Sequence, residues 1–149
     1  MEKFYIPFGD WSDDGHGKYV NILVQAPSME HLLEVQKRIK CIYGEDFFEG
    51  FAQNYEENEF SETVWKALVD CDMPVEYLED EYGISDECET LEDFLKIEPN
   101  PAVYIDITVN AFIWLMNSNG ALITRETDYP MICNWTCRGF ETVGYGCFY

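Results

Sequence analysis

The chain has 149 residues, of which 47% are hydrophobic and 16% aromatic, so it is about one domain long and can bury a core without metals or disulfides. Its 29 acidic and nine basic residues give a formal net charge of −20, which makes nucleic acid and anionic membranes poor direct partners. We therefore expect a single acidic domain over residues 1–149 whose natural partners are cationic.

The N-terminal part predicts two strands and then a helix. Residues 3–8 predict a strand at an edge or a bend, because Pro7 cannot donate to a ladder of backbone hydrogen bonds. Apolar and polar residues alternate over residues 19–26, which predicts a second strand. Ser28 is a typical helix N-cap, and the apolar spacing after it predicts a helix that ends near Tyr43.

The middle third predicts short helices and is strongly acidic. Residues 51–100 hold 16 acidic and two basic residues, and so carry 14 of the 20 net negative charges. Helices are expected after Ser61, from Pro74 and after Thr90, where capping residues precede apolar spacing. The second of these helices should bury Tyr82.

Residues 102–127 are expected to form the central hairpin of the fold. From Val103 to Ala111, apolar and polar residues alternate with the period of two that is typical of a half-buried strand. Residues 117–120, Asn-Ser-Asn-Gly, tolerate positive φ and predict the turn. Residues 121–127 would then return as the second strand.

The order of the predicted elements indicates the fold class. Strands, helices, a long hairpin and a further strand over residues 131–137 are segregated rather than alternating. This order predicts an α+β fold with a mainly antiparallel sheet around the hairpin 102–127 and three or four helices packed on one face.

The N-terminus and the cysteines predict the cellular compartment. The sequence Met1-Glu2-Lys3-Phe4 lacks the apolar core of a signal peptide, and no apolar run approaches the roughly 20 residues of a membrane span. We expect a cytoplasmic protein, in which cysteines remain reduced thiols rather than forming disulfides. The cysteines concerned are Cys41, Cys71, Cys88, Cys133, Cys137 and Cys147.

The sharpest local motif is a loop that resembles the start of an EF-hand calcium site. Residues 10–15, Asp-Trp-Ser-Asp-Asp-Gly, place oxygen ligands at the first, third and fifth positions before a glycine. Asn21 stands where that motif has a bidentate glutamate, and predicted strands flank the loop. The candidate metal ligands are Asp10, Ser12, Asp14 and His16. A structural turn selects the same residue types and is the favoured interpretation, so no metal or other cofactor is expected.

Motifs for catalysis are missing from the sequence. No nucleophile elbow, phosphate-cradling loop or dinucleotide fingerprint occurs, and the abundant carboxylates single out no acid–base pair. Cys133, Cys137 and Cys147 lack the spacing of zinc ligands, and neither His16 nor His31 is near them in sequence. We therefore expect a protein that is not an enzyme.

Residues 76–93, which we call the acidic segment, contain the candidate partner-binding residues. These are Glu76, Glu79, Asp80, Glu81, Asp86, Glu87, Glu89, Glu92 and Asp93. A solvated surface is the simplest explanation of such charges. However, like charges three or four residues apart destabilise a helix, so their concentration here suggests a use.

These observations leave three functional hypotheses. The first is a non-enzymatic interaction protein that docks the acidic segment on a basic protein surface and inhibits a nucleic-acid-binding protein by mimicking nucleic acid. The second is a divalent-metal-binding protein or metal-dependent enzyme that uses Asp10, Asp14 and His16. The third is a structural subunit whose aromatic tail, residues 140–149, buries against a second copy. The oligomeric state and the identity of the partner stay open.

Overall fold

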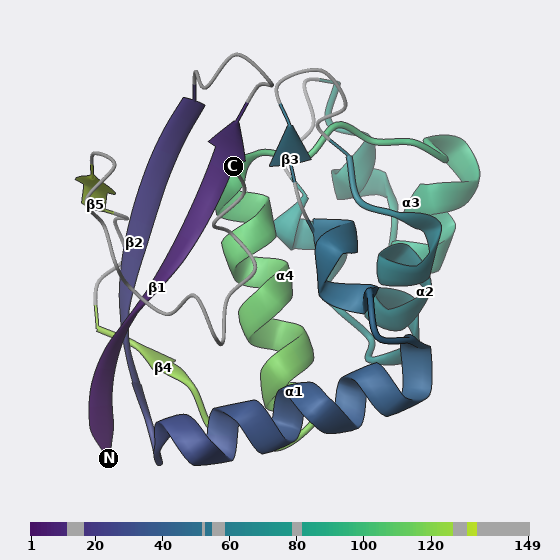
Figure 1. The fold of residues 1–149 in the computed structure, drawn as a ribbon. Helices are drawn as coiled ribbons and strands as arrows, with labels where there is room; N and C mark the ends of the chain where they lie inside the picture. Colours follow the sequence, from purple (N-terminus) through teal and green to yellow (C-terminus); the bar gives the residue numbers. More distant parts are fainter. Residues whose placement is uncertain (12–16, 52, 55–58, 79–81, 127–130, 134–149) are drawn as a thin grey trace.

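The computed structural model of the protein describes residues 1–11, 17–51, 53–54, 59–78, 82–126 and 131–133. Its architecture is α+β: a hairpin of two long antiparallel strands is combined with helices (Figure 1). The elements are β1 (Glu2–Trp11), β2 (Gly17–Ala26), α1 (Met29–Tyr43), the 3₁₀ helix η1 (Phe47–Phe51), β3 (Gln53–Asn54), α2 (Glu62–Asp70), the 3₁₀ helices η2 (Val75–Tyr77) and η3 (Ile84–Glu87), α3 (Leu91–Ile97), α4 (Ile105–Ser118), β4 (Thr124–Arg125) and β5 (Met131–Cys133). No helix in the described ranges has both the length and the apolar character needed to cross a membrane.

The sheet is built on the N-terminal hairpin of β1 and β2, which pair antiparallel along their whole length. The short strand β3 pairs with β1 in parallel, whereas β4 and β5 pair antiparallel with β2. The strands predicted over residues 3–8 and 19–26 are confirmed, and both are longer than predicted. Ile22, Val24 and Ala26 are buried, as the period of two along a strand requires.

Helices α1, α2 and α3 begin where their capping residues predict. The Ser28 hydroxyl accepts a hydrogen bond from the His31 backbone N–H at 3.0 Å at the start of α1. Ser61 caps α2 through the N–H of Val64, and Thr90 caps α3 through that of Asp93, each at 3.2 Å. Each hydroxyl satisfies one of the N–H groups that have no partner within the helix, which fixes the point where the helix begins.

The prediction of a helix from Pro74 was wrong about the length of the helix and about the burial of Tyr82. In the described part of this stretch, which leaves out residues 79–81, the helix formed after Pro74 is the three-residue 3₁₀ helix η2, and Leu78 leaves it in an extended conformation with φ −89° and ψ 113°. Tyr82, which was expected to face inward, is 82% exposed. Like charges three and four residues apart, such as Glu76 with Glu79 and Asp80, weaken a longer helix here.

The central hairpin predicted for residues 102–127 is wrong, because its first strand is the helix α4. Buried residues recur in groups about every four positions, which is the spacing of a helix face. The groups are Ile107, Thr108 and Val109, then Ala111 and Phe112, then Leu115 and Met116. The alternation of apolar and polar residues over 103–111 misled the prediction. A helix that is buried on most sides has few polar positions, so its sequence shows the helical period only weakly. Figure 1 shows α4 lying next to the N-terminal hairpin.

The residues predicted as the hairpin turn form the C-terminal cap of α4 instead. Gly120 has a φ of +87°. The N–H of Gly120 donates to the Asn117 carbonyl, and that of Ala121 to the Met116 carbonyl, each at 3.0 Å. A helix end of this type needs a residue at positive φ, as a tight turn does, so both structures select glycine. The chain then continues into β4, which has two residues in place of the strand expected over residues 121–127.

A cluster of buried phenylalanines joins η1, the residue Phe60 just before α2, and α4. The ring centroids of Phe51 and Phe60 are 5.3 Å apart, and the Phe112 centroid lies 6.0 Å from Phe48 and 6.1 Å from Phe51. All four side chains are at most 4% exposed. Edge-on contacts between buried rings add to the stabilisation from the apolar area that they bury. The cluster therefore holds the middle third of the chain against α4.

Candidate functional site

Six of the nine candidate partner-binding residues lie in the described part of the acidic segment. They are Glu76 in η2, Asp86 and Glu87 in η3, Glu89 just before α3, and Glu92 and Asp93 in the first turn of α3. All six side chains are exposed. Glu79, Asp80 and Glu81 lie outside the described residues. Each candidate that the structure describes therefore carries its charge at the surface.

These six carboxylates are not neutralised within the described part of the molecule. The ion pair found there is Lys3 with Glu126, at 3.6 Å, and it involves none of the six. Lys96 lies in α3 together with Glu92 and Asp93, but forms no ion pair with either of them in the described ranges. Within the described residues, none of the six carboxylates is therefore held in an ion pair with lysine or arginine.

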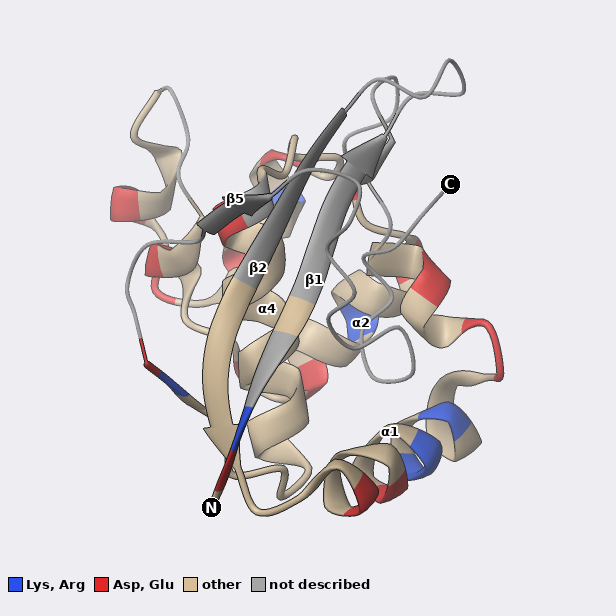
Figure 2. Cartoon of the chain, turned by 60° about the vertical axis from the view of Figure 1, so that its left-hand side comes forward, with Lys and Arg blue, Asp and Glu red and all other residues tan. Residues whose placement is uncertain are grey.

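Basic residues are concentrated on a different element, the second half of α1 (Figure 2). One of them, Arg38, donates from Nη2 to the Asn119 carbonyl at 2.9 Å, and the His31 ring Nε2 lies 2.7 Å from the Gly120 carbonyl. These contacts place donor groups at the negative C-terminal end of α4. Arg38 is therefore engaged by the C-terminal end of α4, and in the described ranges no basic residue of α1 forms an ion pair with the six acids.

Two of the six acids have a structural role that is independent of any partner. Glu92 and Asp93 lie in the first turn of α3, where negative charge is stabilised by the positive end of the helix dipole. Glu76 and Glu89 lie outside the α-helices.

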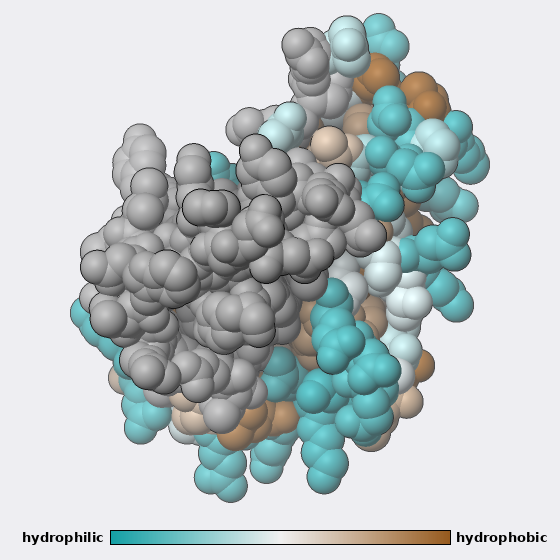
Figure 3. All heavy atoms as spheres, turned by 45° about the horizontal axis from the view of Figure 1, so that its top comes forward, coloured by the Kyte–Doolittle hydropathy of each residue, from teal (hydrophilic) through white to brown (hydrophobic). Residues whose placement is uncertain are grey.

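Figure 3 shows hydrophilic side chains gathered over the side of the molecule that carries α2 and α3, with a few hydrophobic ones among them.

A hollow of about 240 Å³, which we call the acidic groove, lies between the end of α2 and the start of α3. It is lined by Val69, Asp72, Met73, Pro74, Glu89, Thr90, Leu91 and Glu92. Three of these residues carry carboxylates, and only Glu89 and Glu92 were among the candidates from the sequence. Asp72 was missed because it lies outside the acidic segment, and packing of α2 against α3 brings it to the groove.

The position of Asp72 is fixed by the end of α2. Its φ is +54°, and its N–H donates to the Val69 carbonyl while that of Met73 donates to the Leu68 carbonyl, each at 3.1 Å. This is the same pair of capping hydrogen bonds that ends α4. Aspartate tolerates positive φ better than most residues, so the strain is modest. The backbone of Asp72 is consequently held at a defined place beside the groove.

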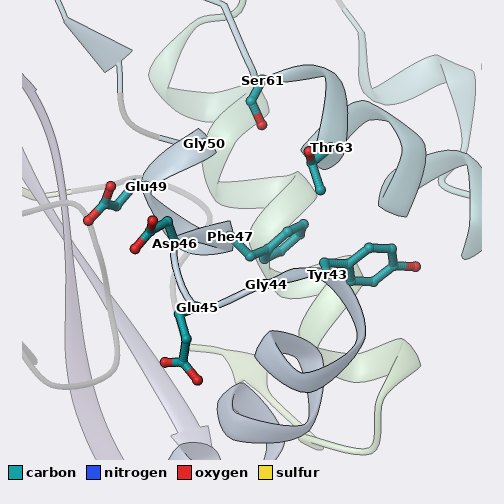
Figure 4. A pocket seen from close by; sticks show the side chains of 9 residues that line it. All are labelled: Tyr43, Gly44, Glu45, Asp46, Phe47, Glu49, Gly50, Ser61 and Thr63. Atoms are coloured by element: carbon teal, nitrogen blue, oxygen red, sulfur yellow. The ribbon is translucent and has the colours of Figure 1, made fainter.

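A second hollow, of about 490 Å³, lies between the end of α1 and the start of α2 (Figure 4). We call it the Tyr43 hollow; its lining includes Tyr43, Phe47 and three further acidic residues, Glu45, Asp46 and Glu49. The rings of Tyr43 and Phe47 are stacked with centroids 5.0 Å apart. Figure 4 shows the carboxylates of Asp46 and Glu49 on one side of the hollow and the Tyr43 ring on the other.

Two groups near these hollows have pKa values above their ordinary ones. Burial raises the pKa of Tyr43, and the hydrogen bond that its hydroxyl donates to Asp70 Oδ2, at 3.1 Å, raises it further. Burial likewise raises the pKa of the Cys71 thiol. Both groups therefore favour their protonated, neutral forms. A nucleophilic cysteine would instead need its thiol ionised to the thiolate.

The residues of the other two hypotheses lie largely outside the described ranges. Asp10 belongs to β1, where only its backbone is described, and Ser12, Asp14 and His16 fall in an undescribed stretch. Among the described residues, no group of three or more His, Cys, Asp or Glu is placed to hold a metal ion. Residues 134–149, which include Cys137, Cys147 and the aromatic tail, are also undescribed, so both hypotheses stay predictions.

The described site can present negative charge to a cation. Its carboxylates lie at the surface, and the acidic groove adds an apolar floor beneath three of them. The chain matches no protein-family model, no curated protein and no solved structure. A function is therefore inferred from the charges and hollows of the chain itself.

Proposed function

We propose that the protein is a non-enzymatic interaction protein of the cytoplasm that docks its acidic segment on a basic surface of another protein. In this proposal the partner is a nucleic-acid-binding protein, which is inhibited because the carboxylates occupy its groove in place of phosphates. The helices, packed on one face of the hairpin, are the scaffold that presents the segment. The observation that carries the proposal is the set of six exposed carboxylates without ion pairs in the described ranges.

The physical basis is the repulsion that the acidic segment carries in the free protein. Like charges close together cost free energy, most strongly at low salt, and a basic partner removes that cost on binding. Attraction between opposite charges also raises the rate of association by steering the partners together. Binding should accordingly weaken as salt is added. A solvated surface without a partner would carry the same repulsion with no compensation.

The proposal is tested by capture from a cell lysate at low salt with matched charge variants. One variant changes the six described acids of the segment to Gln or Asn: Glu76, Asp86, Glu87, Glu89, Glu92 and Asp93. The control makes the same change in net charge at six exposed acids elsewhere: Glu2, Glu30, Glu34, Glu45, Asp46 and Glu49. We expect wild type and control to retain a basic protein that a salt gradient releases, and the six-acid variant to retain none.

Added double-stranded DNA distinguishes mimicry from general charge attraction. If the acidic segment occupies a nucleic-acid groove, DNA should release the captured protein from wild type at constant salt. Retention of the same protein by the six-acid variant would contradict the docking proposal. Capture that DNA does not reverse would contradict the mimicry and leave a basic partner of another kind.

A further inference from the structure

The acidic groove differs from the rest of the acidic surface because its floor is apolar. Met73 and Leu91 line it and are each 2% exposed, so their positions are fixed by packing in the core. Val69 and Pro74 line it as well and are half-buried. A ligand in the groove therefore meets apolar side chains as well as carboxylates.

The carboxylates on the rim come from two elements that are each held in place. Asp72 is fixed by the hydrogen bonds that end α2, and it stands at the end of the helix where the dipole is negative. Glu89 and Glu92 flank Thr90, whose hydroxyl caps α3. Among the residues that the structure describes, no lysine or arginine lines the groove. The groove thus combines an apolar floor with negative charge on residues whose backbone is at or next to a helix cap.

An arginine side chain has the chemistry that this groove complements. Its methylene groups can cover an apolar floor while the charged end remains at the rim. Its guanidinium group is planar and weakly hydrated, and it donates paired hydrogen bonds to carboxylates. A lysine ammonium is a compact, strongly hydrated charge, which loses more hydration on entering a partly apolar hollow.

We propose that the acidic groove is the anchor site for an arginine side chain of the basic partner. The inference rests on the proposed docking function and narrows it to one place on the acidic surface. Interfaces commonly derive most of their affinity from a few such anchors in partly desolvated pockets, with surrounding charges adding steering and selectivity. The groove is the anchor, and the remaining carboxylates of the segment attract the partner.

The anchor is tested by fluorescence anisotropy with two labelled peptides, one of alternating glycine and arginine and one of alternating glycine and lysine. We expect wild type to bind the arginine peptide more tightly than the lysine peptide at equal salt. Neutralising the groove with Asp72→Asn, Glu89→Gln and Glu92→Gln should raise the Kd for the arginine peptide about tenfold. The matched control is Glu45→Gln, Asp46→Asn and Glu49→Gln in the Tyr43 hollow, which changes net charge equally and should raise Kd only about twofold.

A variant that fills the groove separates shape from charge. Val69→Phe adds bulk to the groove wall without altering charge, and should weaken the arginine peptide about tenfold while leaving the salt dependence unchanged. Its melting temperature shows whether it folds; if it does not, the two triple variants decide. Asn suits the positive φ of Asp72, so the groove triple should keep the end of α2 intact.

The outcomes distinguish failure of the anchor from failure of the docking function. Equal effects of the two triple variants, equal affinity for the two peptides, or unchanged affinity of a folded Val69→Phe variant would each overturn the groove as an arginine anchor. In those cases loss of lysate capture by the six-acid variant would still support docking. Failure of wild type to bind either peptide at low salt, together with unchanged capture by the six-acid variant, would overturn both.

Discussion

Replacing Phe112 with alanine is expected to lower the free energy of unfolding by about 3–5 kcal/mol, the usual cost of removing a buried phenylalanine ring. Phe112 is fully buried in α4, and its ring contacts those of Phe48 and Phe51. The change removes apolar contacts and leaves a cavity between α4 and η1, which rigid ring neighbours cannot close completely. Urea denaturation followed by tryptophan fluorescence gives the free energy of unfolding.

A matched control for this change is Ile42→Ala. Ile42 also belongs to a helix, α1, but is 66% exposed. Its replacement should alter the free energy of unfolding by no more than about 0.5 kcal/mol, as is usual for surface positions. If Phe112→Ala were as mild as Ile42→Ala, α4 would not lie in the core, and the packing of the aromatic cluster would be wrong.

Gly50→Ala should also be costly, by about 1–3 kcal/mol, because the position has no room for a methyl group. A Cβ there would lie 2.2 Å from Ser61 Oγ and 2.8 Å from a methyl carbon of Val64. The carbonyl of Gly50 accepts a hydrogen bond from the Ser61 N–H at 3.0 Å, which draws the two backbones together. The added group must therefore displace the start of α2 or break its cap.

The clash with Ser61 can be isolated in a double-mutant cycle. Ser61→Gly removes the nearest clashing atoms, and glycine at an N-cap costs only a few tenths of a kcal/mol. Gly50→Ala should then cost clearly less in the Ser61→Gly background than in wild type, which gives a favourable interaction free energy. Equal costs in the two backgrounds would show that Gly50 and Ser61 are not in contact.

The starts of the helices could be predicted from the sequence because their signals are local. Ser28, Ser61 and Thr90 each accept a hydrogen bond from the N–H three residues later, a contact that depends only on neighbouring residues. The strands of the N-terminal hairpin were also predicted correctly. Their alternation of apolar and polar residues is local in the same way.

The helix α4 could not be predicted from the same kind of pattern because its surroundings decide its structure. Its buried residues include Thr108, which looks like a polar position in the sequence, and its apolar run continues from Ala111 to Met116. A helix that is covered on most sides has weak periodicity, and its length is then the better criterion. Gly120 was correctly expected at positive φ, but a helix end and a hairpin turn both require it.

For the candidate site, exposure could be predicted and the groove could not. Acidic residues are rarely buried without a partner, and this chain has many more acidic than basic residues. The exposure of Glu76 and Glu87 therefore follows from composition. The groove depends on the packing of α2 against α3, which brings Asp72 opposite Glu89 and Glu92. Contacts of this kind join residues that are distant in the sequence, and no local pattern encodes them.

The most direct test of this account is the free energy of unfolding of the six-acid variant, measured by urea denaturation at about 0.01 M salt, where charge repulsion reaches about 30 Å. We expect a value within about 1 kcal/mol of wild type or higher. Removing repulsion offsets the helix-dipole stabilisation lost from Glu92 and Asp93 in α3. A loss of several kcal/mol would contradict the account, because it would show that these carboxylates are engaged inside the fold rather than left for a partner.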